Sequence, residues 1–374
     1  MTLPPRYENL VDRLWEALHE EPCGVEFALI SKGRVCDIVD GLSDMDFRLV
    51  AGTYDPKAWE LAADAFCKVF IAFSHDHPDA LRIVEHPAGR CMVLDELARP
   101  AVLDERYGWD VLRENRPGMV PLLEEIDEDM RRIHLGKLLG YRDPYNPELD
   151  RPVNVNPEDL ARYPVYSICR HYYAPALRCA AIALGEASVH GKDDALRWRR
   201  DAGSEAARHA LDAVNSDFRS SADDLAERCH EDIQAVAREV TGQDDPWPEI
   251  EQAQRDIYSD HDDRIYHLVS SNWMAISRWR FYMEAPEGYD LEAVLRIDRG
   301  HIQNYQVGPF DDEAWCSKLR QHAPDPGAHD RSMAFLAEQH EATDAENPRE
   351  VFASLCEHYG VVWRAMVGWY EEIR

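Results

Sequence analysis

Two aspartates, Asp44 and Asp46, stand two residues apart in a stretch that the sequence predicts to enter a strand. Successive side chains of a strand point to opposite faces, so two carboxylates at this spacing share one face and can bind the same divalent cations. Mg²⁺ prefers carboxylate and phosphate oxygens, and ions held between carboxylates and a triphosphate stabilise the charge of an in-line displacement. The pair predicts such a metal site. The alternative is two acidic residues on a solvated strand end.

A site of this kind is completed by a third carboxylate on a neighbouring strand, and Asp95 is the best-placed candidate. A turn at residues 87–89 should pair a strand at 81–85 with a strand at 91–94, beside the strand that carries Asp46. Asp95 then emerges at the strand end, with Glu85 and Glu96 behind it. A register slip of one residue would turn every side chain to the opposite face and give the role to Glu96.

The elements that must position these residues follow from apolar periodicity and turn signals. The order expected in the first hundred residues is helix, strand, turn, strand, helix and hairpin, with the two helices at 7–20 and 57–73 and the first two strands at 25–30 and 45–50. From about Pro117 onward, long helical periods dominate, at 119–139, 157–188, 192–215, 220–241, 247–284 and 347–373. The chain is therefore predicted to be α+β, with a mixed sheet and flanking helices followed by a larger helical domain.

The stretch from about residue 25 to 96 resembles the nucleotidyltransferase superfamily, which has a DNA polymerase beta-like fold. The nearest members are antibiotic nucleotidyltransferases of the aminoglycoside type, whose pattern is a strand, Gly-Ser-x-x-Arg, a short loop and Ser-Asp-x-Asp. Here Ser31-Lys32-Gly33-Arg34 matches the Ser-x-x-Arg part, and Ser43-Asp44-Met45-Asp46 matches the second part with its leading Ser. Ile30 stands where the family usually has Gly, which normally permits close approach of the backbone to the triphosphate.

The resemblance implies a catalytic domain at residues 1–116 and a helical substrate-binding domain at residues 117–374. It also implies metal binding and catalysis by Asp44, Asp46 and Asp95, and nucleotide binding by Ser31, Arg34 and Ser43. The cofactor would be Mg²⁺, with ATP or another nucleoside triphosphate as co-substrate, and the reaction would move a nucleoside monophosphate to a hydroxyl of a small-molecule acceptor. A non-catalytic nucleotide-binding or regulatory protein on the same fold is the alternative, which the missing Gly favours.

Composition limits the class of partner and the compartment. The 374 residues carry a formal net charge of −30, with 41 basic against 71 acidic residues, so a nucleic-acid backbone is not the expected main partner. The apolar runs are too short to cross a bilayer, and the first residues lack the apolar run of a signal peptide. We therefore expect a cytoplasmic protein without membrane contact.

Four other patterns allow rival interpretations. His75, His77 and Asp79 resemble a His-x-His-x-Asp metal motif, but Ala80 stands where that family has His. Arg255 and His261 have the Arg-x5-His spacing of some helical ribonucleases, although polar helix faces produce it by chance. Two clusters could contact a substrate but are more often core or helix surface: Trp273, Trp279, Phe281 and Tyr282 with Arg278 and Arg280; and Arg170, His171, Tyr172 and Tyr173.

Overall fold

The computed structural model describes residues 3–20, 24–79, 81–84, 90–97, 99, 108–121, 125–143, 164–216, 223–257, 260–343 and 347–374. The chain divides into two compact units. The first comprises Met1–Val102, Trp109–Pro121 and His261–Arg374, and it contains the sheet. The second comprises Leu103–Gly108 and Leu122–Asp260, and its described elements are helical.

A four-stranded mixed sheet, in the order β3-β2-β1-β4, forms the centre of the first unit. Its strands are β1 (Phe27–Ser31), β2 (Phe47–Ala51), β3 (Arg90–Val93) and β4 (Asp110–Glu114). Strand β1 pairs antiparallel with both β2 and β4, whereas β3 runs parallel to β2. The predicted α+β class with a mixed sheet and a larger helical part is therefore confirmed.

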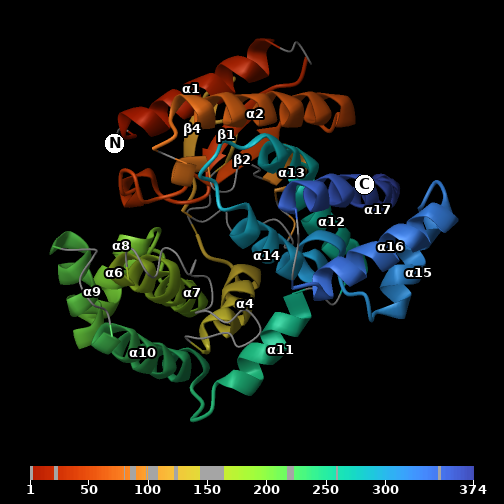
Figure 1. Cartoon of the computed structure of the whole chain (residues 1–374). Helices are drawn as coiled ribbons and strands as arrows, with labels where there is room; N and C mark the ends of the chain where they lie inside the picture. Colours follow the sequence, from red (N-terminus) through yellow and green to blue (C-terminus); the bar gives the residue numbers. More distant parts are fainter. Residues whose placement is uncertain are drawn as a thin grey trace. The chain divides into compact units, whose positions relative to one another are not determined.

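Each face of the sheet packs into its own apolar cluster. Alternate residues such as Phe27, Leu29 and Phe47 join the main core with helices α1 (Pro5–Glu20) and α2 (Pro56–Asp76). These two helices lie side by side in Figure 1. On the other face Ile30 packs in a smaller cluster that includes Trp109. This alternation is the period of two that a sheet buried on both sides requires.

Helix α2 has a sequence-encoded N-cap at Asp55. The Asp55 side chain accepts hydrogen bonds from the backbone N–H groups of Lys57 and Ala58, at 3.0 and 3.2 Å. Pro56 follows at the first helical turn, where a missing N–H is of no consequence. Within the helix, Trp59 is fully buried and packs edge-on against Trp273, with ring centroids 4.5 Å apart.

The last third of the chain completes the first unit with helices that pack on α2 and on one another. Helix α13 contacts both α2 and α17, and α17 also contacts α12, α14, α15 and α16. The bounds are α12 (His261–Asn272), α13 (Ala275–Glu284), α14 (Leu291–His301), the π-helix η6 (Ile302–Val307), α15 (Glu313–Gln321), α16 (Pro326–Glu341) and α17 (Pro348–Ile373).

The second unit is a set of helices around a core rich in alanine, cysteine and tyrosine. An ion network around the buried Arg199 joins helices of this unit: the guanidinium lies 2.8 Å from the Asp232 carboxylate and 2.8 Å from the exposed Glu239 carboxylate. The bounds are α4 (Glu128–Lys137), η4 (Leu138–Tyr141), α6 (Pro164–Ser167), the π-helix η5 (Ile168–Tyr173), α7 (Ala174–Leu184), α8 (Lys192–Asp201), α9 (Glu205–Ser216), α10 (Asp223–Thr241) and α11 (Trp247–Ile257).

Three features differ from the prediction. The two units do not follow the expected boundary between 1–116 and 117–374, because residues 261–374 pack with the sheet. The expected hairpin is wrong: Leu81–Val84 is a short 3-10 helix, η2, and β3 pairs with β2 in parallel. Residues 85–89, which include Glu85 and the expected turn, lie outside the described residues. Strand β4 was not predicted.

Within the described part of the chain, no helix combines the length and the apolar character that crossing a membrane requires.

Candidate functional site

The antiparallel pairing of β1 with β2 brings the Ser31–Arg34 turn beside the Asp44–Asp46 segment. Ser31 lies opposite Phe47 in the register, and the pairing continues one step further, where the Lys32 N–H donates to the Asp46 carbonyl at 3.0 Å. The end of β1 therefore meets the start of β2 at one edge of the sheet. The two halves of the sequence pattern, 12 positions apart, become neighbours in space.

Asp44 and Asp46 precede β2 in an extended segment and alternate with buried residues. Met45 is 3% exposed and Phe47 is 1% exposed, and both belong to the main core. Both aspartates, by contrast, are half-buried. Because side chains alternate along an extended chain, the two carboxylates are on the side away from that core. Their predicted common face is compatible with this burial pattern.

A lysine of the turn lies next to one of these carboxylates. The Lys32 ammonium is 3.8 Å from Asp46 Oδ2, and the two side chains are 41% and 37% exposed. Directly opposite residues of an antiparallel pair lie on the same face, which explains the approach. A cation thus lies beside Asp46.

The two serines of the pattern have structural partners. Ser31 is 4% exposed, and its hydroxyl donates to the Gly33 carbonyl at 2.7 Å, which closes the turn. The Ser43 hydroxyl accepts from the Val39 N–H at 3.0 Å, while its backbone carbonyl accepts from the Tyr7 hydroxyl at 2.7 Å. Ser43 therefore anchors the loop before Asp44 to α1. Neither contact tests the predicted role in nucleotide binding.

Arg34 points to a carboxylate that the sequence interpretation missed. Its Nε lies 3.2 Å from Asp110 Oδ1, and the other oxygen of Asp110 accepts from the Val35 N–H at 2.6 Å. Asp110 opens β4 and lies opposite Ser31, so it fixes the end of the turn to the sheet. The Arg34 side chain is 29% exposed, and its terminal amino groups form no hydrogen bond with described residues. Three of the five β4 residues are charged, so the sequence pattern did not predict this strand.

The structure does not bring Asp95 to Asp44 and Asp46, so its assignment as third carboxylate is corrected. Strand β3 runs parallel to β2, with Val93 opposite Ala51, five residues past Asp46. At roughly 3.3 Å per residue, Asp95 lies beyond about 16 Å along the sheet, too far for shared metal ligands. Its side chain is 72% exposed and faces Arg374 at 3.4 Å.

Glu96, the alternative to Asp95, is buried and engaged elsewhere. It belongs to the 3-10 helix η3 (Leu94–Glu96), which ends the strand alternation after Val93. Its carboxylate accepts from the Tyr370 hydroxyl at 2.6 Å and from Arg374 Nη1 at 2.7 Å. Burial raises the pKa of the Glu96 carboxyl, and the two donors oppose that rise. Glu96 therefore ties α17 to the far end of the sheet.

The rival metal motif has local partners. Asp76, at the end of α2, accepts from Arg13 at 2.7 Å, and Asp79 accepts from Arg6 at 2.8 Å. His77 packs on Phe73, with ring centroids 4.6 Å apart. These contacts hold the end of α2 against α1 and support the structural interpretation of this loop.

Arg255 and His261 belong to different helices. Arg255, on α11, donates to Gln252 at 3.0 Å, and His261, at the start of α12, lies 3.1 Å from Asp312. Each residue has its own local partner, which favours the interpretation as polar helix residues.

The two aromatic clusters are core. All four aromatic residues of the first cluster are at most 7% exposed, and the Trp279 indole donates to Asp298 at 2.7 Å. In the second, Tyr172 and Tyr173 are fully buried on the π-helix η5, and the Tyr173 hydroxyl donates to Asp232 at 2.5 Å. These positions support packing in place of substrate contact.

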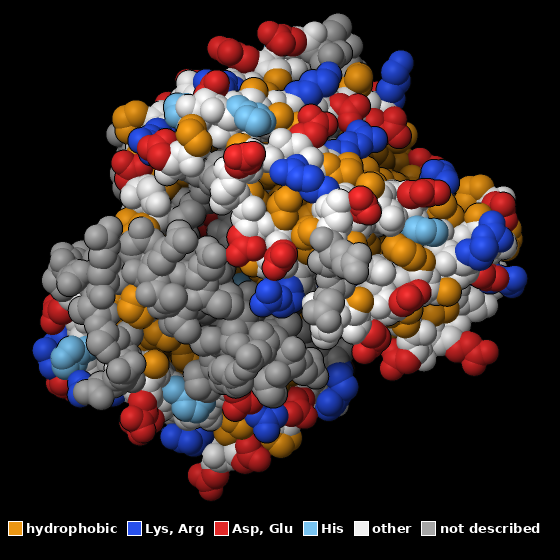
Figure 2. All heavy atoms as spheres, viewed as in Figure 1, with side chains coloured by type: hydrophobic (Ala, Val, Ile, Leu, Met, Phe, Trp, Pro, Cys, Tyr) orange, Lys and Arg blue, Asp and Glu red, His pale blue; other side chains and the backbone are white. Residues whose placement is uncertain are grey.

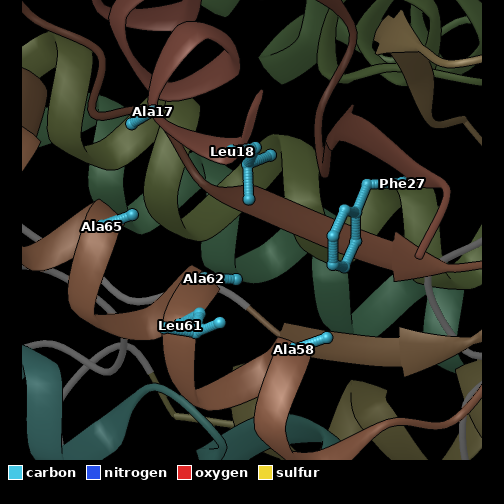
Figure 3. Close-up of a pocket in the computed structure, with 7 residues that line it drawn as sticks. All are labelled: Ala17, Leu18, Phe27, Ala58, Leu61, Ala62 and Ala65. Carbon is cyan, nitrogen blue, oxygen red and sulfur yellow. The ribbon is translucent and has the colours of Figure 1, made fainter. Parts of the chain in front are cut away.

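Two further features of the described residues, a gap in the core and the charge pattern of one face, give no second candidate site. Figure 3 shows a gap between α1, α2 and β1, lined by Ala17, Leu18, Phe27, Ala58, Leu61, Ala62 and Ala65, which leaves no room for a water-sized sphere. It is a packing gap in the main core. On the face drawn in Figure 2, acidic and basic side chains are interspersed among the described residues.

The donor set at the sheet edge fits Mg²⁺ most fully as a site shared with phosphates. Among the described residues, no three His, Cys, Asp or Glu side chains gather closely enough to hold a metal. Mg²⁺ is, however, commonly bound by one or two carboxylates with substrate phosphates and water as the remaining ligands. Asp44 and Asp46 match that smaller set in residue type and burial.

Comparison of the chain with protein-family models, with curated proteins and with solved structures finds no match in any of the three.

Proposed function

We propose that the chain is a magnesium-dependent nucleotidyltransferase of the DNA polymerase beta-like superfamily. The observation that carries the proposal is the β1–β2 pairing, which places the Ser31–Arg34 turn at the same sheet edge as Asp44 and Asp46. A turn that binds phosphates next to a pair of carboxylates is what transfer from a metal-bound nucleoside triphosphate requires.

Asp44 and Asp46 would hold Mg²⁺, which offsets the charge of the triphosphate when it is bound. The free amino groups of Arg34 would contact the phosphates, with Asp110 fixing the direction of the guanidinium through Nε. Backbone N–H groups of the turn would add further donors. Ser31 and Ser43 keep the turn and the Asp44 loop in place, and Ser31 could donate to a phosphate after leaving Gly33.

The reaction would join an acceptor hydroxyl oxygen to the α-phosphorus of the nucleotide. The bond from that phosphorus to the bridging oxygen breaks, pyrophosphate leaves, and the acceptor proton passes to solvent or a carboxylate. The co-substrate is proposed to be ATP or another nucleoside triphosphate, and the acceptor a small molecule.

A second candidate is a nucleotide-binding or regulatory protein that does not catalyse transfer. Ile30 favours it, because its side chain is fully buried in the cluster with Trp109 where the superfamily pattern has Gly. A packed side chain here limits how closely the backbone can approach a triphosphate. Binding without pyrophosphate release would identify this candidate.

The proposed function is tested by incubating the protein with Mg²⁺, mixed nucleoside triphosphates and a panel of hydroxyl-bearing small molecules. Mass spectrometry should detect an acceptor that has gained a nucleoside monophosphate, together with pyrophosphate. Asp46→Asn should abolish the product, while Asp95→Asn, the matched control at the other end of the sheet, should retain it. Equal product with Asp46→Asn and wild type would contradict the proposal.

A further inference from the structure

The side chain of Lys32, in the Ser31–Arg34 turn, lies next to the carboxylate of Asp46. The backbone hydrogen bond from Lys32 to Asp46 fixes the two residues opposite each other, and the side chains meet at 3.8 Å. The side chain follows Ser31 and precedes Gly33, so it belongs to the turn that would bind phosphates. Lys32 is therefore part of the phosphate-binding half of the proposed site, and its ammonium lies next to the metal-binding half.

A lysine ammonium and a divalent cation compete for the same carboxylate. Both carry positive charge, and both are satisfied by carboxylate oxygens. The Lys32–Asp46 pair is half-exposed, and ion pairs of that kind contribute about 1 kcal/mol or less, so a metal can displace the ammonium at small cost. The displaced side chain stays tethered next to the phosphate-binding turn.

We propose that Lys32 is the resident counter-ion of Asp46 and becomes a phosphate ligand when a divalent cation replaces it. This inference rests on the proposed function and adds to it a positioning residue with two partners. Before the metal arrives, the Lys32 ammonium lowers the repulsion between Asp44 and Asp46. When the metal is bound, the exchange moves a positive charge to the triphosphate. No covalent bond changes in this step.

The residue type suits the exchange. Only six of the 41 basic residues are lysines, so arginine is the usual cation of this chain. An arginine at position 32 would hold both oxygens of a carboxylate in a planar fork, whereas an ammonium is a compact, hydrated point charge on a flexible stem. A lysine is therefore easier for a metal to displace, and Lys32→Arg provides a direct test of this difference.

The first experiment measures the affinity of the intact protein for Mn²⁺ alone, by electron paramagnetic resonance of the free ion. Lys32→Gln should bind Mn²⁺ about fivefold more tightly than wild type, which is the effect of removing one charge at about 4 Å in water. Lys32→Arg should bind it more weakly than wild type. Lys57→Gln is the matched control, because it removes the same charge from an exposed position at the start of α2, past the other end of β2.

The second experiment measures binding of a non-hydrolysable ATP analogue in saturating Mg²⁺ by calorimetry. Lys32→Gln should bind it about fivefold more weakly than wild type, opposite in sign to its effect on Mn²⁺. Unchanged Mn²⁺ affinity in Lys32→Gln, together with lost affinity in Asp46→Asn, would overturn the exchange and leave the proposed function standing. Absence of both Mn²⁺ and nucleotide binding in wild type and Lys32→Gln would overturn both.

Discussion

At the scale of single residues, the turn from Ser31 to Arg34 keeps both of its cations beside carboxylates. Lys32 lies near Asp46, just before β2, and Arg34 lies near Asp110, at the start of β4. In a chain with a net charge of −30, these two cations are the charges that the proposed function assigns to phosphate binding. The charged residues of the proposed site are therefore few, and they are partly exposed.

Arg34→Ala should weaken Mg²⁺-dependent nucleotide binding about tenfold, because a charge-assisted contact to phosphate contributes about 1.5 kcal/mol or more. Calorimetric titration with a non-hydrolysable ATP analogue measures the change. Arg116→Ala is the control, since that arginine is paired with Glu26 at the opposite end of β1 and is 56% exposed. Equal affinity in wild type and Arg34→Ala would remove Arg34 from the site.

Because Asp95 lies away from the proposed metal site and Glu96 is buried, we expect Glu96→Ala to reduce stability and Asp95→Ala to have little effect. Glu96→Ala leaves the buried Tyr370 hydroxyl and Arg374 without their acceptor, so the free energy of unfolding should fall by about 3 kcal/mol. Asp95→Ala removes only an exposed ion pair and should leave stability and activity near wild type. Urea unfolding of both variants measures this, and lost turnover with intact folding in Asp95→Ala would contradict the corrected assignment.

At the scale of elements, hydrogen bonds to the largely buried Asp232 join helices of the second unit. Asp232 on α10 accepts from Arg199 on α8 and from the Tyr173 hydroxyl of η5, at 2.8 and 2.5 Å. Burial raises the pKa of the Asp232 carboxyl, but the hydrogen bonds from Arg199 and Tyr173 outweigh burial and hold it below its usual value. A carboxylate so placed stabilises the fold only while it is ionised.

Asp232→Asn should therefore destabilise the protein in a pH-dependent way. A carboxyl whose pKa is lower in the folded state contributes fully above its unfolded pKa, near 4. That contribution is lost as the pH falls through the lower folded pKa. Urea unfolding at pH 6 should show a deficit of about 3 kcal/mol for Asp232→Asn, and the deficit should shrink below about pH 4. A deficit that does not change with pH would contradict the role of the ionised carboxylate.

Local periodicity predicted the elements whose apolar faces repeat cleanly. The helices at α1 and α2 and the strands β1 and β2 lie within a few residues of the expected ranges. The pairing of β3 could not be predicted, because a parallel partner is chosen by tertiary packing and not by a local turn. Strand β4 was missed because Asp110, Arg113 and Glu114 hide its apolar residues. The site predictions divide in the same way. The placement of Asp44 and Asp46 relied on β1 and β2, which were predicted, whereas the placement of Asp95 relied on the pairing of β3, which was not.

At the scale of the whole molecule, the first unit is assembled from the two ends of the chain. Residues 261–374 supply helix α13, which packs with α2, and helix α17, which packs with α13, and Trp273 covers the fully buried Trp59. The expected domain boundary at residue 116 differs from the structure because the periodicity of a helix does not indicate which hydrophobic core the helix packs into. The sequence-based division placed all helices after residue 117 in one domain.

A fragment of residues 1–121 should therefore not fold on its own. It would expose the face of α2 that packs on α13, including Trp59, and would lose the partners of Glu96. Circular dichroism and amide exchange of this fragment should show little protected structure. A stable, monomeric fragment with cooperative unfolding would show that the predicted domain of residues 1–116 is autonomous after all.

The central claim is that Asp44 and Asp46 bind a metal–nucleotide complex beside the Ser31–Arg34 turn. Calorimetric titration of the whole chain with a non-hydrolysable ATP analogue, with Mg²⁺ and with excess chelator, tests it most directly. We predict one saturable binding site that requires Mg²⁺ and is lost in Asp44→Asn and Asp46→Asn while folding is retained. Nucleotide binding of equal affinity in chelator, or in either variant, would contradict the claim, as would the absence of binding to any nucleoside triphosphate.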